Sequence, residues 1–275
     1  MIVLRFLRTV LGWVWIFTDT MTTALRIGLH GESEMAERLI RGWARRFLRV
    51  AGAQVIVRRD AELDRNRSYV FVSNHTSYLD VPAIISVADH PLRFIAKQEL
   101  TYIPLFGWAA RRVGHVFIDR KDRRGATKAI RDRFARGLRG ASLLFFAEGT
   151  RAVGDELLPF KKGAAVAALE TGLDCVPIAV AGARAVVRPK GFALFRPGPV
   201  AVVFGAPIAA TGFALESRDQ LVAAQRSAVV IVSAKIQAQP RIVRKKRRTI
   251  TGPSAPRGTP RPREREARPR SSPRP

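Results

Sequence analysis

His75 and Asp80 stand five positions apart in the segment SNHTSYLD, residues 73–80. An imidazole can remove a proton from a hydroxyl near neutral pH, and a carboxylate can orient the ring and stabilise its charged form. Positions five apart on a regular helix point about 140° away from each other, so the pair meets only if His75 lies in a loop and Asp80 in a first helical turn. Ser77 and Asp80 match a capping box with Ser77 as the N-cap, which favours that placement. The alternative is that Asp80 only caps a helix and that His75 is an ordinary loop residue.

Two arginines could supply a phosphate site close to this pair. Arg120 ends the segment GHVFIDR, and Arg151 ends the segment FFAEGTR. Each follows a predicted strand, and two guanidinium groups at one sheet edge can bind a phosphate bidentately. The segment FKKG, residues 160–163, then enters a helix whose N-terminus also favours anions. Alone, each charge could be a solvated surface group, but together with His75 they indicate a hydroxyl-activating base beside a phosphate site.

The elements that must position these residues alternate in type along the chain. Short runs of β-branched and aromatic residues predict strands over 54–58, 69–72, 93–96, 116–119, 142–147, 175–180 and 200–204. Helical patterns lie near 80–88, 98–112, 123–138, 162–171 and 215–237. This alternation predicts an α/β domain with a mainly parallel central sheet that is flanked by helices. Because ligands in such sheets bind beyond the carboxyl ends of the strands, His75 lies where chemistry is expected.

The first 30 residues have the pattern of an amphipathic helix. On a helical wheel the charges fall within an arc of roughly 60°, and they are Arg5, Arg8, Asp19 and Arg26. The opposite side is apolar and holds Phe6, Val10, Trp13, Val14, Phe17 and Met21. The uncharged run, residues 9–18, is shorter than the roughly 20 apolar residues of a spanning helix, so we expect this helix to lie in a membrane interface. A core helix of a soluble protein and a cleaved signal peptide are the alternatives.

A second amphipathic segment covers residues 34–50. One face carries Met35, Leu39, Trp43, Phe47 and Val50, and the other carries Arg38, Arg41, Arg45 and Arg49. A basic face opposite an apolar face with Trp is typical of a helix at a membrane surface. The same pattern also fits a surface helix that packs on the domain.

The composition bounds the class of protein. The chain has 275 residues and is 47% hydrophobic, which is enough for a substantial core. Its net charge of +26 indicates polyanionic partners, namely nucleic acid, anionic lipid or acidic carrier proteins. The single cysteine, Cys175, excludes an intrachain disulfide and fits a reducing compartment. No Cys/His cluster has metal-ligand spacing, so we expect neither a metal nor a cofactor.

The chain divides into three parts by composition. Residues 1–50 hold the predicted membrane-associating helices, and residues 51–239 form the predicted catalytic domain. Residues 240–275 are rich in Arg and Pro, and their last 35 positions carry 13 Lys and Arg against 2 Glu. Because few apolar residues remain there, we predict a disordered basic tail.

Across about residues 69–180 the order of motifs resembles the bacterial 1-acyl-sn-glycerol-3-phosphate acyltransferases, the lysophosphatidate branch of the glycerolipid acyltransferase superfamily. The motifs are NH-x4-D at 74–80, FIAKQEL at 94–100 with Pro104 and Gly107, GHVFIDR at 114–120, EGTR at 148–151 and VPI at 176–178. One departure is Ala147, where the family usually has Pro before the EGTR block. We expect that change to relax the turn without removing a functional group.

The resemblance implies a role for each matching residue. It implies that His75 is the general base and that Asp80 orients it. It associates the glycerophosphate group with Gly114, Arg120, Glu148, Gly149, Thr150 and Arg151, and it links the Val-Pro block to the acyl donor and the fold. Lys97 and the backbone amides after Ser77 are candidates for stabilising the oxyanion.

The expected reaction is transfer of a fatty acyl group to the sn-2 hydroxyl of 1-acyl-sn-glycerol 3-phosphate, giving phosphatidic acid. The expected donor is a thioester of acyl carrier protein or coenzyme A. No G-x-S-x-G elbow is present, so we expect direct transfer without an acyl-enzyme. The lipid acceptor places the protein at an anionic membrane surface, as a peripheral or monotopic protein on the cytoplasmic face of the inner membrane.

Three alternatives remain open from the sequence. An acyltransferase with another acceptor, such as a lyso-aminolipid or glycerol 3-phosphate, fits the motifs almost as well. A basic nucleic-acid-binding protein would explain the charge, but no RNP-like, KH-like or zinc-finger signature supports it, so no nucleic-acid partner is expected. A catalytically inactive membrane scaffold is the third.

Overall fold

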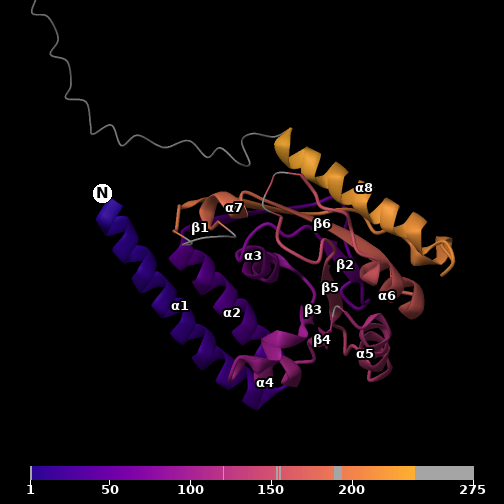
Figure 1. Cartoon of the computed structure of the whole chain (residues 1–275), viewed down its shortest axis with the longest axis horizontal. Coiled ribbons are helices and arrows are strands. Elements are labelled where there is room, and N and C mark those ends of the chain that lie inside the picture. Colours follow the sequence, from indigo (N-terminus) through magenta and orange to yellow (C-terminus); the bar gives the residue numbers. More distant parts are fainter. Residues whose placement is uncertain (1, 120, 153, 155, 189–193, 239–275) are drawn as a thin grey trace, which may run out of the picture. The chain divides into compact units, whose positions relative to one another are not determined.

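The structure is a computed structural model that describes residues 2–119, 121–152, 154, 156–188 and 194–238. Its described part contains a seven-stranded sheet in the order β1-β7-β6-β2-β5-β3-β4 (Figure 1). The strands are β1 Ala53–Arg59, β2 Val70–Ser73, β3 Leu92–Lys97, β4 Val116–Ile118, β5 Ser142–Phe146, β6 Cys175–Ala181 and β7 Gly198–Phe204. All pairs are parallel except β6 with β7. The predicted α/β fold with a mainly parallel sheet is therefore confirmed.

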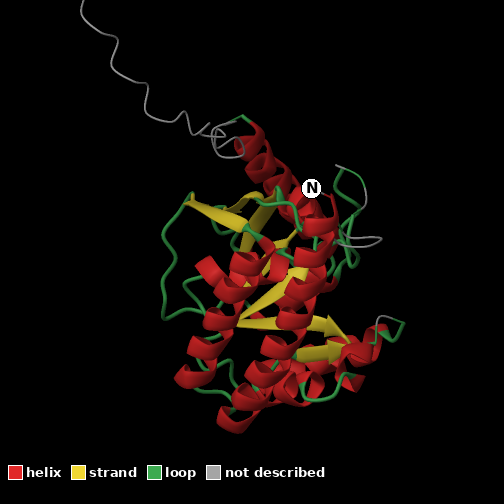
Figure 2. Cartoon of the chain, turned by 90° about the vertical axis from the view of Figure 1, so that its left-hand side faces the viewer, coloured by secondary structure: helices red, strands yellow, loops and turns green. Residues whose placement is uncertain are grey.

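Helices cover both faces of this sheet. They are α1 Ile2–His30, α2 Glu34–Ala51, α3 Asp80–Val87, α4 Phe106–Arg112, α5 Arg123–Ala135, α6 Gly163–Thr171, α7 Ala183–Val186 and α8 Arg218–Gln237, with 3-10 turns η1 Gln98–Tyr102 and η2 Ala210–Gly212. Helices α2 and α3 share one hydrophobic core with the sheet, and α5, α6 and α8 share the other. Figure 2, viewed from the side of α1 and α2, shows helices crossing in front of the strands.

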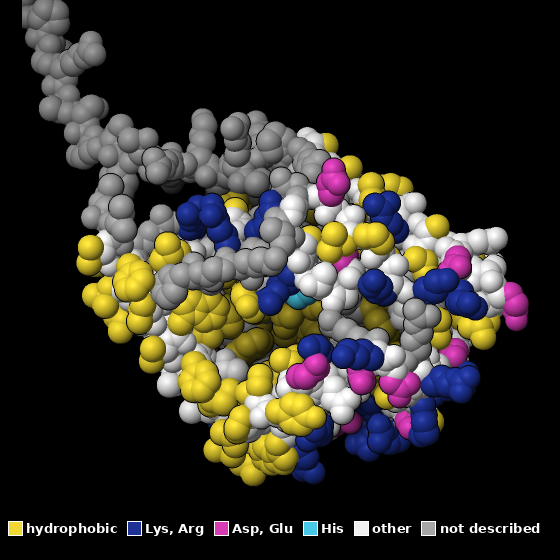
Figure 3. Space-filling model, in the orientation of Figure 1, with side chains coloured by type: hydrophobic (Ala, Val, Ile, Leu, Met, Phe, Trp, Pro, Cys, Tyr) yellow, Lys and Arg dark blue, Asp and Glu magenta, His cyan; other side chains and the backbone are white. Residues whose placement is uncertain are grey.

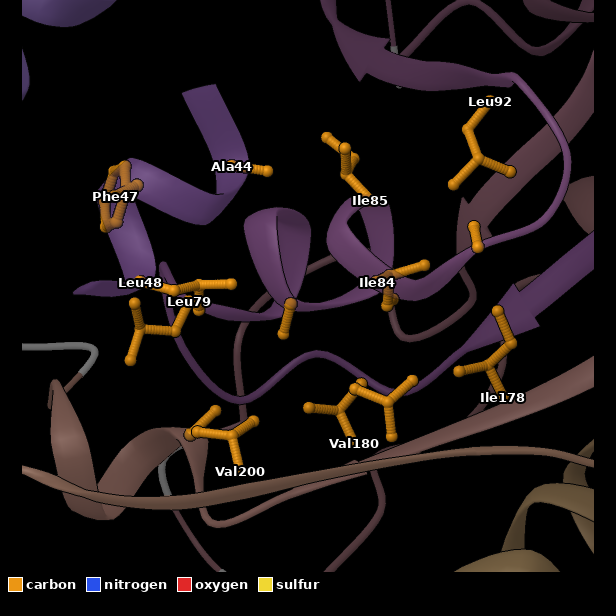
Figure 4. Close-up of a cluster of buried hydrophobic side chains, with 14 of the residues drawn as sticks. Ala44, Phe47, Leu48, Leu79, Ile84, Ile85, Leu92, Ile178, Val180 and Val200 are labelled. Atoms are coloured by element: carbon orange, nitrogen blue, oxygen red, sulfur yellow. The ribbon is translucent and has the colours of Figure 1, made fainter. Parts of the chain in front are cut away.

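The two faces of the central strand β2 supply both cores. Phe71 belongs to the core under α2 and α3, while Val70 and Val72 belong to the core on the opposite face. Figure 4 shows the first core, where Leu79 lies beside Leu48 of α2, and Ile84 of α3 lies above Val180 of the sheet. Because β2, β3 and β5 run parallel, their carboxyl ends meet at one edge, and the segments that follow them carry the candidate site.

Helix α1 buries small residues together with Ile16 and Ile27, and it leaves a large apolar surface exposed. Gly12, Thr23 and Ala24 are buried on its inner side. Among the α1 side chains that the structure describes, ten large apolar ones are exposed: Val3, Leu4, Phe6, Leu7, Leu11, Val14, Trp15, Phe17, Leu25 and Leu29. No helix in the described ranges is long and apolar enough to span a membrane.

Two large residues on the apolar face of helix α2 pack against protein. Phe47 is buried in the core, Trp43 packs against that core, and the Trp43 indole donates to Thr20 of α1 at 2.9 Å. Helices α1 and α3 both contact α2. Phe47 and Trp43 thus pack against protein, whereas Met35 of the same face is 42% exposed, and membrane association of α2 stays a prediction.

Two local predictions were wrong. Residues 98–112 do not form one helix, because Pro104 cannot continue η1 into α4, and Leu105 adopts φ 59 between them. Ser77 is not the N-cap of α3, which begins at Asp80. The Ser77 hydroxyl nevertheless accepts the Leu79 N–H at 3.2 Å, and Asp80 accepts the Ser77 N–H at 2.8 Å, so the hydrogen bonds of a capping box form just ahead of the helix. The same hydroxyl donates to the Val187 carbonyl at 2.7 Å.

Candidate active site

His75 and Asp80 meet across the junction between the loop after β2 and helix α3. Nδ1 of His75 lies 2.9 Å from Oδ2 of Asp80. The carboxylate is fully buried and also accepts the backbone N–H groups of Thr76 and Ser77. A carboxylate acceptor at Nδ1 requires the proton there, so the neutral ring has its lone pair on Nε2. This is the tautomer that a general base needs.

Buried contacts fix the backbone that carries His75. The Glu148 carboxylate accepts the His75 N–H at 2.7 Å and the Leu158 N–H at 2.9 Å. The Asn74 side chain donates to the Val180 carbonyl at 3.0 Å and accepts the Val180 N–H at 2.8 Å. These bonds join the loop to β5 and β6, so the position of the imidazole depends on the sheet rather than on the loop alone.

The imidazole is held from one side by an aromatic ring. Phe146, the last residue of β5, stacks on His75 with ring centroids 4.0 Å apart and an interplanar angle of 22°. The His75 side chain remains 19% exposed. One face of the ring is thus packed, while part of the side chain stays accessible.

His75 lines an apolar cavity of about 560 Å³. Its walls include residues of α1, α2, β3, α4 and β4, among them Ile27, Trp43, Phe94 and Phe117. In Figure 3 a hollow with apolar side chains at its floor opens near the middle of the view, with a histidine at its edge and Lys or Arg around it. Such a cavity can hold a hydrocarbon chain whose reactive end lies at the histidine.

Arg151 also lines this cavity, and it has no hydrogen-bond or ion-pair acceptor among the residues that the structure describes. Its guanidinium carbon lies 3.7 Å from the centroid of the Tyr78 ring. A guanidinium presents five N–H donors in one plane, so stacking on an aromatic face leaves those donors for an anion.

The structure brings most of the predicted site residues to this cavity. Besides His75 and Arg151, its lining includes Gly149, Thr150 and Lys97. Gly149 has φ 71, a left-handed conformation that glycine adopts readily, so it allows the turn after β5. Lys97 forms an ion pair with Glu99.

Asp80, Glu148 and Gly114 do not line the cavity, and Asp80 is fully buried against His75. Glu148 is 2% exposed, and both its oxygens accept backbone N–H groups. Burial raises the pKa of Glu148 against the opposing effect of these bonds. Gly114 precedes β4 at the opposite sheet edge, where a Cβ would collide with the Glu32–Arg133 ion pair. Arg120 lies outside the described residues.

His115 also lines the cavity, although it was not predicted as a site residue from the sequence. Burial lowers its pKa from 6.5 to about 3, with smaller contributions from Arg93 and Arg133. Its Nδ1 accepts the Phe94 N–H at 3.3 Å, so the neutral ring carries its proton on Nε2. Nothing in its sequence spacing indicates this position, because the cavity wall is formed by segments far apart in the chain.

Fold and site together define a class of protein: an α/β domain with a hydrogen-bonded His–Asp pair where its parallel strands end, beside an apolar cavity that an arginine also lines. Comparison with known families agrees with this class, since the model of the family described as Acyltransferase matches residues 54–181. Residues 54–181 of this chain are therefore similar to an Acyltransferase domain.

Two relatives and one solved structure illustrate the similarity. The chain is 35% identical over 167 residues to a 1-acyl-sn-glycerol-3-phosphate acyltransferase of Chlamydomonas reinhardtii, covering 60% of this chain and 48% of that protein. It is 35% identical over 147 residues to a lyso-ornithine lipid O-acyltransferase of Pseudomonas aeruginosa, covering 53% and 54%. The crystal structure of the 1-acyl-sn-glycerophosphate (LPA) acyltransferase PlsC from Thermotoga maritima matches with a TM-score of 0.69 and 25% identity, covering 85% of this chain and 96% of that one. The chain spans about half the length of the curated relatives it matches.

Proposed function

We propose that this protein transfers a fatty acyl group from a thioester donor to the sn-2 hydroxyl of 1-acyl-sn-glycerol 3-phosphate, giving phosphatidic acid. The observation that carries the proposal is the His75–Asp80 pair at an apolar cavity, beside the Arg151 guanidinium, which stacks on Tyr78 and has no acceptor among the described residues. The names of the relatives support the same reaction class.

In the proposed reaction the acceptor phosphate binds Arg151, which brings the free hydroxyl to Nε2 of His75. The imidazole takes the hydroxyl proton while the oxygen attacks the thioester carbonyl carbon. The tetrahedral intermediate then expels the thiolate, which takes the proton back from the imidazolium. Asp80 stays ionised throughout and stabilises the imidazolium. The donor is a thioester of acyl carrier protein or of coenzyme A.

The remaining site residues have supporting roles in this proposal. Gly149 and Thr150 shape the turn that carries Arg151, and Lys97 is a candidate for stabilising the oxyanion from the β3 side. Glu148 holds the His75 backbone and does not touch the substrate.

The exposed apolar surface of α1 supports a location at the membrane surface. A helix that buries one side in protein and presents large apolar side chains on the other can insert into the acyl boundary of one leaflet. The net charge of +26 adds attraction to anionic headgroups. We propose peripheral association with the cytoplasmic face of the inner membrane.

A lyso-aminolipid acceptor is the second candidate function, because one relative is named a lyso-ornithine lipid O-acyltransferase. The reaction at His75 would be the same, and Arg151 would bind another anionic group of the acceptor. The two candidates therefore differ in the acceptor alone.

Product identification separates these candidates. The purified protein is incubated with lysophosphatidate, lyso-ornithine lipid or glycerol 3-phosphate and with each donor in turn, and the products are identified by mass spectrometry. We expect phosphatidic acid as the main product. Acylation of lyso-ornithine lipid alone would favour the second candidate, and no acylated product from any acceptor would refute both.

A further inference from the structure

The Arg151 guanidinium stacks on the ring of Tyr78. A half-buried arginine normally finds a carboxylate or carbonyl acceptor, but the contact found for Arg151 within the described ranges is the Tyr78 ring, at 3.7 Å from Cζ to the centroid. An arginine side chain has many rotamers, and ordering them costs free energy. Stacking on a fixed ring reduces that cost without using the N–H donors.

The backbone of Tyr78 is fixed by its two neighbours. The Ser77 hydroxyl donates to the Val187 carbonyl at 2.7 Å, and Leu79 is fully buried in the core. Tyr78 itself is 45% exposed, so burial does not determine the direction of its ring.

The Tyr78 ring also contacts Trp13 of α1. The Trp13 and Tyr78 rings meet edge to face, with centroids 6.3 Å apart and an interplanar angle of 79°. Trp13 in turn packs against Phe47 at 6.1 Å and Phe195 at 5.1 Å. A continuous row of aromatic contacts therefore runs from the interior through α1 to the guanidinium of Arg151.

We propose that Tyr78 is a positioning residue for Arg151, and that Trp13 braces its ring, so that helix α1 takes part in recognition of the acceptor's anionic headgroup. The proposal deepens the proposed function and rests on it. It assigns the Tyr78 ring, rather than its hydroxyl, to this task.

Discrimination between two acceptors tests the proposal. Lysophosphatidate and the matching monoacylglycerol share the acyl chain and the free hydroxyl, and differ in the phosphate. We expect Tyr78→Leu to lower kcat/KM for lysophosphatidate about tenfold. The kcat/KM for monoacylglycerol and the KM for the donor should stay unchanged. Tyr78→Phe should retain the discrimination, and Trp13→Leu should lose part of it in detergent micelles. Phe134→Leu, an exposed aromatic of α5, is the matched control.

A double-mutant cycle with Arg151→Ala makes the test sharper. If Tyr78 acts through Arg151, adding Tyr78→Leu to Arg151→Ala should have no further effect on discrimination. Additive losses, or equal losses for both acceptors, would overturn the proposal. Calorimetry measures binding of lysophosphatidate to the four proteins of the cycle, namely the unaltered protein, the two single variants and the double variant. This gives the same comparison without turnover. An unaltered protein that binds lysophosphatidate but acylates no acceptor would refute the proposed function while leaving this inference testable.

Discussion

At the scale of single residues, hydrogen bonds to distant backbone groups determine where the proposed base stands. The His75–Asp80 contact was predictable, because a strand end, a loop and a helix start place two nearby residues together. The Glu148–His75 bond was not, since a side chain after β5 meets a backbone N–H after β2, and no local pattern records that approach. The contact between Arg151 and Tyr78 was not predictable for the same reason.

The first prediction concerns Glu148. A glutamine at this position has one acceptor oxygen, so Glu148→Gln leaves either the His75 or the Leu158 N–H facing an NH2 group. We expect a loss of about 1–3 kcal/mol in the free energy of unfolding and a clear fall in kcat. Urea unfolding and initial rates measure both, with exposed Glu216→Gln as the control. Unchanged stability and rate would show that the carboxylate does not hold the loop.

The second prediction is a pH dependence that comes from His115. Burial lowers the pKa of this imidazole to about 3, whereas the unfolded chain takes up the proton near 6.5. Between these values the unfolded state binds more protons, so the free energy of unfolding falls as the pH falls. We expect this group to account for up to about 2 kcal/mol between pH 8 and pH 5. His115→Phe should flatten the curve, while exposed His30→Gln should not; parallel curves for all three proteins would contradict the assignment.

At the scale of elements, two buried ion pairs attach the α1–α2 hairpin to the α/β domain. Arg93 of β3 pairs with Glu37 of α2 at 2.6 Å, and Arg133 of α5 pairs with Glu32 at 2.8 Å. The strands and most helices were predictable from periodicity, because each pattern is local. The partner of an apolar helix face was not, since the patterns of α1 and α2 fit protein and membrane alike.

The third prediction tests this attachment. Glu37→Ala removes the carboxylate that pairs with Arg93, and the Arg93 side chain is only 4% exposed. We expect a loss of about 3 kcal/mol or more in the free energy of unfolding. Glu34→Ala removes an exposed carboxylate from the same helix, and its pair with Arg38 is solvent-screened, so we expect little change. Equal effects in chemical denaturation would mean that the buried pair does not secure the hairpin.

At the scale of the whole molecule, the exposed apolar side chains of α1 and those near α4 lie on one side of the view in Figure 3. Leu11 and Leu25 are 59% and 45% exposed, so replacing them removes apolar surface without disturbing the core. We expect Leu11→Asn with Leu25→Asn to weaken vesicle binding about tenfold or more. Sedimentation with anionic vesicles measures this, and Leu215→Asn, 43% exposed before α8, is the control. Equal binding by both proteins would exclude α1 as the insertion surface.

Removal of residues 240–275, a predicted basic tail outside the described residues, should weaken binding to anionic vesicles at low salt. Acyl transfer in detergent micelles should stay unchanged, because every described cavity residue remains. Loss of transfer in micelles together with nucleic-acid binding by the full chain would support the nucleic-acid alternative instead.

The most direct test of the central claim is the rate of labelled acyl transfer to lysophosphatidate by His75→Ala. The variant is assayed in micelles beside the unaltered protein, after circular dichroism has verified its fold. We expect the rate to fall by about 10²- to 10⁴-fold, because the imidazole removes the hydroxyl proton. A folded His75→Ala protein that transfers the acyl group at nearly the original rate would contradict the mechanism.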